Sequence, residues 1–247
     1  MKDRVIVICG ASSGIGAATA ELVAAGGASV VVVARGEVGL AEVVARCGPQ
    51  ALAIPADLTR RDEVNRVAEM ALARFGRIDA WINNVGRGIS RVPSELTGED
   101  IDLMIQTNVK TALYGMQAVL PHFKARGEGH IINVSSLLGR VPFALVRAAY
   151  SGSKHFLNSL TANFRTEVRA THPGIQISLV SPGVVATDFG LKALHGGPDS
   201  RSFPGAQTAE EVAAVIASVI ETREPDVYTR ADAHDTVVGY YAKGIRA

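Results

Sequence analysis

The sequence predicts an α/β fold, namely a single Rossmann-type domain with a seven-stranded parallel sheet and helices on both faces. Short β-branched runs alternate with longer segments of helical periodicity, which is the pattern of βαβ units. Several of these runs are apolar without alternation, which suits strands that helices cover on both sides. With 247 residues, of which 47% are hydrophobic and 20% charged, we expect residues 1–247 to form one domain.

The expected strands are spread along the whole chain. They cover residues 5–9, 30–34, 51–54, 80–83, 130–134, 176–180 and 226–228. Three helix starts are predicted where a threonine stands three residues ahead of an acid, at Thr59, Thr97 and Thr208. Gly48 and Gly76 are predicted to end helices, because glycine readily takes the left-handed conformation of a helix end.

The charge balance and the cysteines exclude several classes of protein. Lys+Arg number 25 against 24 Asp+Glu without charged blocks, so nothing indicates a nucleic-acid partner. Cys9 and Cys47 are too few for a disulfide framework and have no metal-ligand spacing. The first apolar run stops at Gly10, too soon for a signal segment or a membrane span. We therefore expect a cytoplasmic protein without metal, membrane or nucleic-acid partners.

A glycine-rich turn directly follows the first expected strand. Its residues are Gly10, Ser12, Ser13, Gly14, Ile15 and Gly16, with Ala11 between the first two. Glycines let the backbone approach a pyrophosphate, and the free N–H groups of the following helix attract its negative charge. The spacing departs from G-x-G-x-x-G, since Thr19 stands where the last glycine is usual. The turn predicts a phosphate site.

The end of the second expected strand favours NADP(H) over NAD(H). A dinucleotide fold that prefers NAD usually has an acid here to bind the ribose 2′-hydroxyl. Arg35 follows the strand instead, and a guanidinium suits a 2′-phosphate. Two alternatives stay open: Glu37 is close enough in sequence to serve NAD(H), and Arg35 is also compatible with a solvated strand end.

Tyr150 and Lys154 are four residues apart, so on a helix they lie on one face. The lysine ammonium is expected to favour tyrosinate and to lower the phenol pKa from its reference of about 10. Such a phenol is able to act as a general acid or base. By itself the pair is equally typical of an ordinary helix surface.

The motifs occur in an order that is typical of a known family. They are the Gly10 turn, Asn83-Asn84-Val85-Gly86, Asn108, Ser135-Ser136, Tyr150-x-x-x-Lys154 and Pro182-Gly183. The chain resembles the short-chain dehydrogenase/reductase family in its roughly 250-residue form, from residue 4 to about residue 188. The resemblance implies hydride transfer between a nicotinamide cofactor and a carbonyl or secondary alcohol.

The resemblance also assigns four catalytic positions. Tyr150 would exchange a proton with the substrate oxygen. Ser136, rather than Ser135, would orient that oxygen, because the family's serine stands before a two-residue step to glycine, here Gly139. Lys154 would hold the nicotinamide ribose, and Asn108 would position a water that relays protons.

Further cofactor contacts follow from the same resemblance. Asp57 would meet the adenine, Thr187 would hold the carboxamide, and Asn83 would flank the cofactor. The remaining positions are Leu58, Asn84, Gly86, Pro182, Gly183 and Val185. Cys9 and Val85 replace the family's usual threonine and alanine, and we expect them to tune affinity or stability.

The substrate wall is expected to be apolar. The candidates are Leu138, Phe143, Leu191 and Leu194, with residues 189–205 as a substrate-binding loop that closes as a lid. They suggest a hydrophobic ketone, aldehyde or alcohol. Arg87, Arg91, Arg140 and Arg147 offer charges for an anionic substrate, although a surface role is favoured for each, and His195 is a further loop candidate.

Three alternatives to simple reduction or oxidation remain in view. One is an NADP(H)-binding sensor or scaffold without turnover; a second is an NAD(H)-preferring dehydrogenase of the same fold. A third is epimerisation or dehydration, as in longer relatives. The resemblance implies a homodimer or homotetramer formed through the helices that carry Asn108 and Tyr150. The apolar faces that would support it contain Ala112, Leu113, Met116, Leu157 and Leu160.

Overall fold

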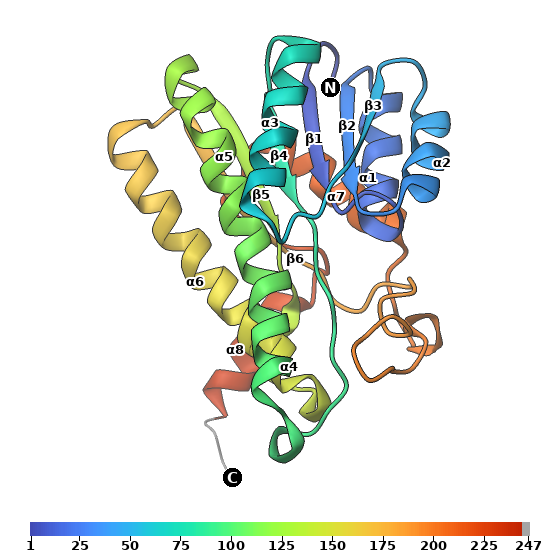
Figure 1. The fold of residues 1–247 in the computed structure, drawn as a ribbon. Helices are drawn as coiled ribbons and strands as arrows, with labels where there is room; N and C mark the ends of the chain where they lie inside the picture. Colours follow the sequence, from blue (N-terminus) through green and yellow to red (C-terminus); the bar gives the residue numbers. More distant parts are fainter. Residues whose placement is uncertain (244–247) are drawn as a thin grey trace.

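The computed structural model describes residues 1–243 and has one sheet of seven parallel strands, as predicted. The strand order is β3-β2-β1-β4-β5-β6-β7. The strands are β1 (Val5–Cys9), β2 (Ser29–Ala34), β3 (Ala51–Pro55), β4 (Ala80–Asn83), β5 (Gly129–Val134), β6 (Ile175–Ser181) and β7 (Asp226–Tyr228), as Figure 1 shows. Each differs from its predicted range by at most one residue at either end, so the β-branched runs located the sheet well.

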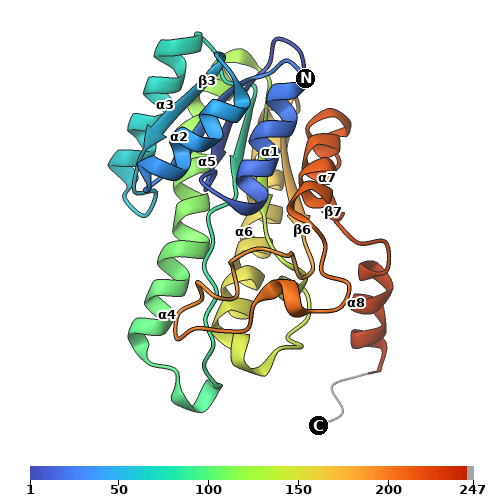
Figure 2. The ribbon, with the colours of Figure 1, turned by 90° about the vertical axis from the view of Figure 1, so that its right-hand side faces the viewer.

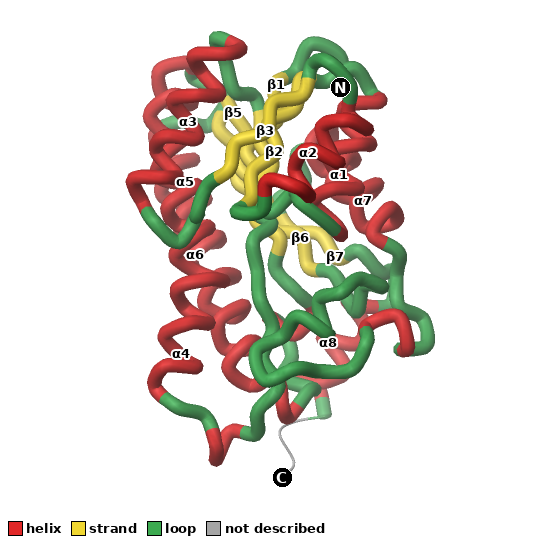
Figure 3. The backbone as a smooth tube through the Cα atoms, turned by 45° about the vertical axis from the view of Figure 1, so that its right-hand side comes forward, coloured by secondary structure: helices red, strands yellow, loops and turns green. Residues whose placement is uncertain are grey.

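Helices cover both faces of the sheet. The α-helices are α1 (Gly14–Ala25), α2 (Glu37–Cys47), α3 (Arg61–Phe75), α4 (Gly98–Ile105), α5 (Thr111–Arg126), α6 (Ala148–Thr171), α7 (Ala209–Thr222) and α8 (Ala233–Ala242). Figure 3 shows α1, α2 and α7 on one side of the strands and α3, α5 and α6 on the other. The three-layer arrangement is therefore the predicted one.

Alternate residues of each strand build two separate cores. In β1, Ile6 and Ile8 pack toward the face that α1, α2 and α7 cover. Val7 and Cys9 point the other way, toward Phe123 of α5. All five side chains are fully or almost fully buried, and each large apolar one contributes about 1.5–3 kcal/mol to folding.

The helix ends test the capping predictions. Thr97 and Thr208 each form the predicted capping box. The prediction at Thr59 is wrong, because α3 starts at Arg61 and has Arg60 as its N-cap. Asp57 accepts hydrogen bonds from the Thr59 main chain and hydroxyl at 3.0 and 2.8 Å, and this local turn uses the threonine before the helix begins. Gly48 and Gly76 end α2 and α3 with positive φ, as predicted.

The carboxyl ends of the strands all lie at one edge of the sheet, where the connections that follow β1, β4, β5 and β6 converge. Figure 2 shows the long connection between β6 and α7 crossing below this edge and approaching α4. Ligands of open α/β sheets bind in this crevice, beyond the strand ends. Among residues 1–243, no helix is long and apolar enough to cross a membrane.

Candidate active site

The glycine turn after β1 has a backbone that only small residues permit. Gly10 and Gly14 have φ values of +82° and +56°, in the left-handed region. A Cβ on Gly16 would lie 2.2 Å from the Gly10 carbonyl oxygen, so any larger residue would break the turn. Asn84 donates from Nδ2 to the same carbonyl at 3.0 Å and thereby ties the end of β4 to the turn.

The turn presents the N-terminus of α1 to the crevice. Ser13 is the N-cap residue and makes no side-chain capping bond, and the first turn of the helix holds no acid. These features fit a pyrophosphate, because the first N–H groups of a helix attract an anion. Ser12 and Ile15 are half-buried beside the turn, where they would line the same site.

Arg35 and Asp57 follow neighbouring strands. Ala34 pairs with Pro55, so both side chains lie at one corner of the sheet. Arg35 is exposed and has no ion pair within residues 1–243, which fits a 2′-phosphate ligand. Asp57 is half-buried next to Leu58, whose side chain is buried. This corner thus offers one exposed cation and one half-buried carboxylate to a dinucleotide.

The prediction that Asn83 flanks the cofactor is wrong. Its side chain is turned into the core, where Oδ1 accepts from Trp81 at 2.8 Å and Nδ2 donates to Asn133 at 2.8 Å. Asn133 donates in turn to the Thr161 hydroxyl at 2.9 Å. This buried polar chain joins β4, β5 and α6, and buried amides need such partners. Asn83 therefore stabilises the fold beneath the site.

Tyr150 lies buried at the start of α6. Its ring meets the ring of Phe189 edge to face, with 5.5 Å between the centroids. Burial raises the pKa of Tyr150 to about 12, while a hydrogen bond from Ser136 and the charge of Arg147 act in the opposite direction. The expected net lowering of this pKa is wrong, because loss of hydration outweighs the favourable neighbours. The phenol is protonated at neutral pH.

Lys154 lies one turn further along α6. Its ammonium donates to the Val134 carbonyl at 2.9 Å and lies 5.9 Å from the centroid of the Tyr150 ring. Burial lowers the pKa of Lys154 to about 8. A Cβ on Gly86 would lie 3.5 Å from this ammonium, so the loop after β4 passes directly over it.

The two serines after β5 have different surroundings. Ser136 lies near enough to Tyr150 to lower the pKa of its phenol, and the Ser136 hydroxyl accepts from the main chain of Leu138 at 3.2 Å. Ser135 donates to Asn158 of α6 and belongs to the packing between β5 and that helix. The geometry therefore supports Ser136, rather than Ser135, as the serine that faces the reacting oxygen.

Asn108 lies in a short π-helical stretch, Gln106–Lys110, that joins α4 to α5 without a break. Such π-turns frequently occur at functional sites. Its Oδ1 accepts from the main chain of Arg87 at 2.7 Å, and its Nδ2 donates to the Arg87 carbonyl and the Ser153 hydroxyl at 3.0 Å each. The fully buried amide thus fixes the loop after β4 to α6.

The residues after β6 close the cofactor side of the crevice. The Cγ2 of Thr187 lies 3.2 Å from the Cβ position of Gly14, so it covers the glycine turn. The carbonyl of Pro182 accepts from the main chain of Leu137 at 2.7 Å, and Gly183 contacts Arg230 through the space where a Cβ would lie. Val185 is buried and pairs with Gln207 in an isolated bridge.

Only part of the predicted substrate wall lies near Tyr150. Leu138 and Leu194 pack against the small cluster that contains Tyr150 and Ile89. Phe143 is 52% exposed and meets the ring of Tyr240 in α8 edge to face, with 5.3 Å between the centroids, while Leu191 is 51% exposed. Phe189 was missed as a wall residue, although its position two residues after Thr187 was a usable signal.

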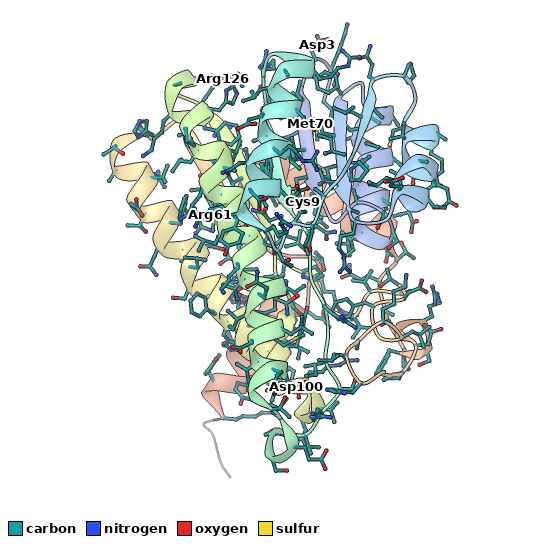
Figure 4. The ribbon with its side chains drawn as sticks, in the orientation of Figure 1. Asp3, Cys9, Arg61, Met70, Asp100 and Arg126 are labelled. Carbon is teal, nitrogen blue, oxygen red and sulfur yellow. The ribbon has the colours of Figure 1, made fainter. Side chains whose placement is uncertain are left out.

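The 189–205 segment is attached to the loop after β4 and to α4. Leu194 donates to the Gly88 carbonyl at 2.8 Å and accepts from the main chain of Ser90 at 2.9 Å. His195 bonds through Nε2 to Asp100 at 2.8 Å, and Figure 4 places Asp100 near the lower end of the long α4–α5 helix. These contacts attach the segment beside the crevice, and its role as a lid stays a prediction.

The arginines and the helix faces differ from expectation. Arg91 and Arg140 pair with Asp100 and Asp226, but Arg147 is half-buried near Tyr150, so a surface role for Arg147 is wrong. Three residues of the expected subunit interface, Ala112, Met116 and Leu157, are buried inside this chain, whereas Leu113 and Leu160 are half-buried. Within residues 1–243 no group of three potential metal ligands gathers.

Comparison with known proteins points to one family. A sequence model described as short chain dehydrogenase matches residues 4–195. The uncharacterized oxidoreductase YxnA of Bacillus subtilis is 37% identical over 193 residues, which cover 76% of this chain and 54% of that protein. The uncharacterized oxidoreductase SSP1627 of Staphylococcus saprophyticus is 38% identical over 190 residues, covering 76% of this chain and 77% of that protein.

Solved structures agree over almost the whole chain. A short chain dehydrogenase/reductase from Burkholderia phymatum in complex with NAD superposes with a TM-score of 0.88 at 25% identity, covering 96% of this chain and 92% of that one. A short-chain dehydrogenase from Streptomyces avermitilis gives 0.86 at 30% identity, covering 98% and 93%. The 3-ketoacyl-(acyl-carrier-protein) reductase from Brucella melitensis complexed with NADH gives 0.80 at 26% identity, covering 92% and 98%.

Proposed function

This chain belongs to the short-chain dehydrogenase family and has the fold of an NAD(P)-dependent oxidoreductase that acts on alcohol and carbonyl groups. We propose that it reduces a hydrophobic ketone or aldehyde with NADPH, with Tyr150 as the general acid. The observation that carries the proposal is the buried Tyr150 phenol, which has Ser136 beside it and the Lys154 ammonium 5.9 Å from the centroid of its ring.

The protonation state of Tyr150 supports reduction of a carbonyl, rather than oxidation of an alcohol, as the proposed reaction. A phenol whose pKa lies near 12 holds its proton at neutral pH, and reduction of a carbonyl requires a proton donor at the oxygen. The Ser136 hydroxyl would orient that oxygen. Arg147 and Lys154 would stabilise the phenolate that remains after the proton has moved. When bound, NADPH supplies the hydride that adds to the carbonyl carbon.

The cofactor preference is supported by the corner at Arg35. The guanidinium is exposed at the end of β2, where a 2′-phosphate would gain a charge-assisted hydrogen bond. The related structures with NAD and NADH show that this fold also takes the unphosphorylated form, so NAD(H) is the alternative. Arg35→Ala should raise KM for NADPH about tenfold or more and leave KM for NADH unchanged. Arg169→Ala, an exposed change on α6, is the control.

The oligomer is a separate part of the proposal. We propose a homodimer or homotetramer that uses the outer faces of α5 and α6, where Phe156 is 53% exposed. Size-exclusion chromatography with light scattering tests it, and Phe156→Glu should weaken the assembly because a charge would replace an apolar contact. A monomeric wild type would contradict this part alone.

The activity itself is tested by NADPH consumption with aromatic ketones, cyclic ketones and β-keto thioesters. The proposal predicts turnover of at least one class. If the purified protein binds NADPH but consumes none with any class, it acts as a cofactor sensor or scaffold, and the proposed reaction is wrong. Faster turnover with NADH than with NADPH would instead overturn only the cofactor preference.

A further inference from the structure

Arg147, unlike Arg91 and Arg140, has no acid beside it among the described residues. Arg91 is neutralised by Asp100 at 2.9 Å, and Arg140 by Asp226. The single hydrogen bond of the Arg147 guanidinium within residues 1–243 runs from Nη1 to the Ile89 carbonyl at 3.0 Å. Burying a cation without a counter-charge costs free energy, so a half-buried guanidinium that lacks an acid needs an explanation.

The guanidinium lies between the loop after β4 and the 189–205 segment. A Cβ on Gly88 would approach Nη1 to 2.8 Å, and a Cβ on Gly197 would approach Nη2 to 2.9 Å. In its present position the guanidinium thus occupies the space that side chains at these two positions would take. Arg147 stands three residues before Tyr150, and its charge acts on the phenol. The cation thus belongs to the reaction site.

Ser90 supplies a second polar group at the same place. Its hydroxyl is buried and has no hydrogen-bond partner among the described residues, which is unusual for a buried polar atom. It lies 2.9 Å from the Cβ position of Gly197, as Arg147 Nη2 does. A guanidinium nitrogen and a free hydroxyl therefore flank one point, which the Gly190 carbonyl oxygen approaches to 2.7 Å. Gly190 and Gly197 both belong to the 189–205 segment, so a carboxylate would reach this point only when that segment has moved away.

We propose that Arg147 and Ser90 form an anion subsite, so that the substrate is an oxo acid or hydroxy acid whose carboxylate binds there. This inference rests on the proposed function and narrows its substrate class. A planar guanidinium suits a carboxylate, and a hydroxyl is able to donate to a second carboxylate oxygen. The apolar wall formed by Leu138, Phe189 and Leu194 would receive the carbon chain between the carboxylate and the carbonyl.

Entry of the carboxylate requires the 189–205 segment to lift, since Gly197 covers the space between the two groups. The segment is attached to the body through Leu194 and His195, both close in sequence to Gly197. The carboxylate of the substrate would then take the place of Gly197 and form hydrogen bonds with Arg147 and Ser90.

The test compares straight-chain oxo acids of increasing length with their methyl esters, on the NADPH-bound protein. Binding is measured by calorimetry and turnover by NADPH consumption. In the wild type at least one acid should bind and react about tenfold or more better than its ester. Arg147→Gln should remove that preference, because KM should rise about tenfold or more further for the acid than for the ester, whatever both substrates lose through Tyr150. Arg147→Lys should restore part of it, Ser90→Ala should reduce it, and Arg169→Gln should leave it intact.

Two results would overturn the inference. One is a wild type that treats every acid and its ester alike. The other is an Arg147→Gln variant that loses acid and ester turnover equally, which would show that Arg147 acts through Tyr150 alone. Unchanged NADPH affinity of the variant shows that it is folded. If no compound consumes NADPH, the proposed reduction fails, while the acid preference in calorimetry still decides whether the subsite exists.

Discussion

The ammonium of Lys154 lies 5.9 Å from the centroid of the Tyr150 ring, and both side chains are buried. Burial acts against the charge of each: it raises the pKa of Tyr150 to about 12 and lowers that of Lys154 to about 8. Groups perturbed in this way at a sheet edge are typical of reaction sites. Burial of these two groups should therefore lower the free energy of unfolding of the protein.

Lys154→Met should stabilise the protein at pH 7. In wild type, the burial penalty is fully present below about pH 8, declines as the folded state loses its proton, and is gone above about pH 10.5. The penalty is on the order of 3 kcal/mol, and loss of the bond to Val134 offsets about 1 kcal/mol. Urea denaturation at pH 7 and pH 10.5 should show an advantage that shrinks at the higher pH. An equal difference at both pH values would contradict this origin.

His130→Gln should make the protein more resistant to acid. His130 is buried on β5, bonds to Ser178 at 2.8 Å, and has its pKa lowered to about 3, mainly by burial. Between pH 6.5 and 3 the unfolded state holds more protons, so stability falls with the pH, by about 2 kcal/mol at pH 5. The free energy of unfolding of the variant should change less between pH 7 and pH 5. The exposed change His234→Gln should keep the wild-type slope, and an equally steep slope for His130→Gln would refute the assignment.

Gly16→Ala should abolish NADPH binding and lower stability. The added Cβ would lie 2.2 Å from the Gly10 carbonyl oxygen, a distance that forces the turn to open. Backbone displacement of this kind costs about 1–3 kcal/mol or more. Gly98→Ala is the matched control, because a Cβ there meets nothing within 4 Å. Cofactor titration by fluorescence checks the prediction, and near-normal affinity of the Gly16 variant would show that the turn does not hold the dinucleotide.

His195→Ala should loosen the 189–205 segment. The variant loses the bond from Nε2 to Asp100, while the main-chain bonds of Leu194 remain. Limited trypsin digestion should cleave faster at Lys192 and Arg201, which are both exposed. His234→Ala serves as the control. Equal cleavage rates for wild type and His195→Ala would show that the hydrogen bond between His195 and Asp100 does not hold the segment.

The sheet and most helix ends were predictable because they depend on local patterns. The runs of β-branched residues at β1 and β2 fix strands wherever they occur, and threonine with an acid three residues later fixes the starts of α4 and α7. Thr59 failed because Asp57, two residues earlier, competes for the same donors. Because capping signals act over only a few residues, this error moved the predicted N-cap by one residue, from Arg60 to Thr59.

The site was less predictable because its properties depend on contacts across the chain. The motif located Tyr150, but the sign of its pKa shift depends on burial beneath Phe189 and the neighbouring loops. Asn83 was assigned by its place in a motif, whereas Trp81 and Asn133 draw its amide into the core. Arg147 was assigned to the surface because nothing in its local sequence shows that Gly88 and Gly197 make room for it.

The most direct test of the account is Tyr150→Phe with a ketone that the wild type reduces. The variant keeps the ring and its packing against Phe189 but has no proton to give. NADPH affinity should be unchanged, and kcat should fall by at least about 10²-fold, the usual contribution of a general acid. Turnover near the wild-type rate would contradict the assignment of Tyr150 as the proton donor.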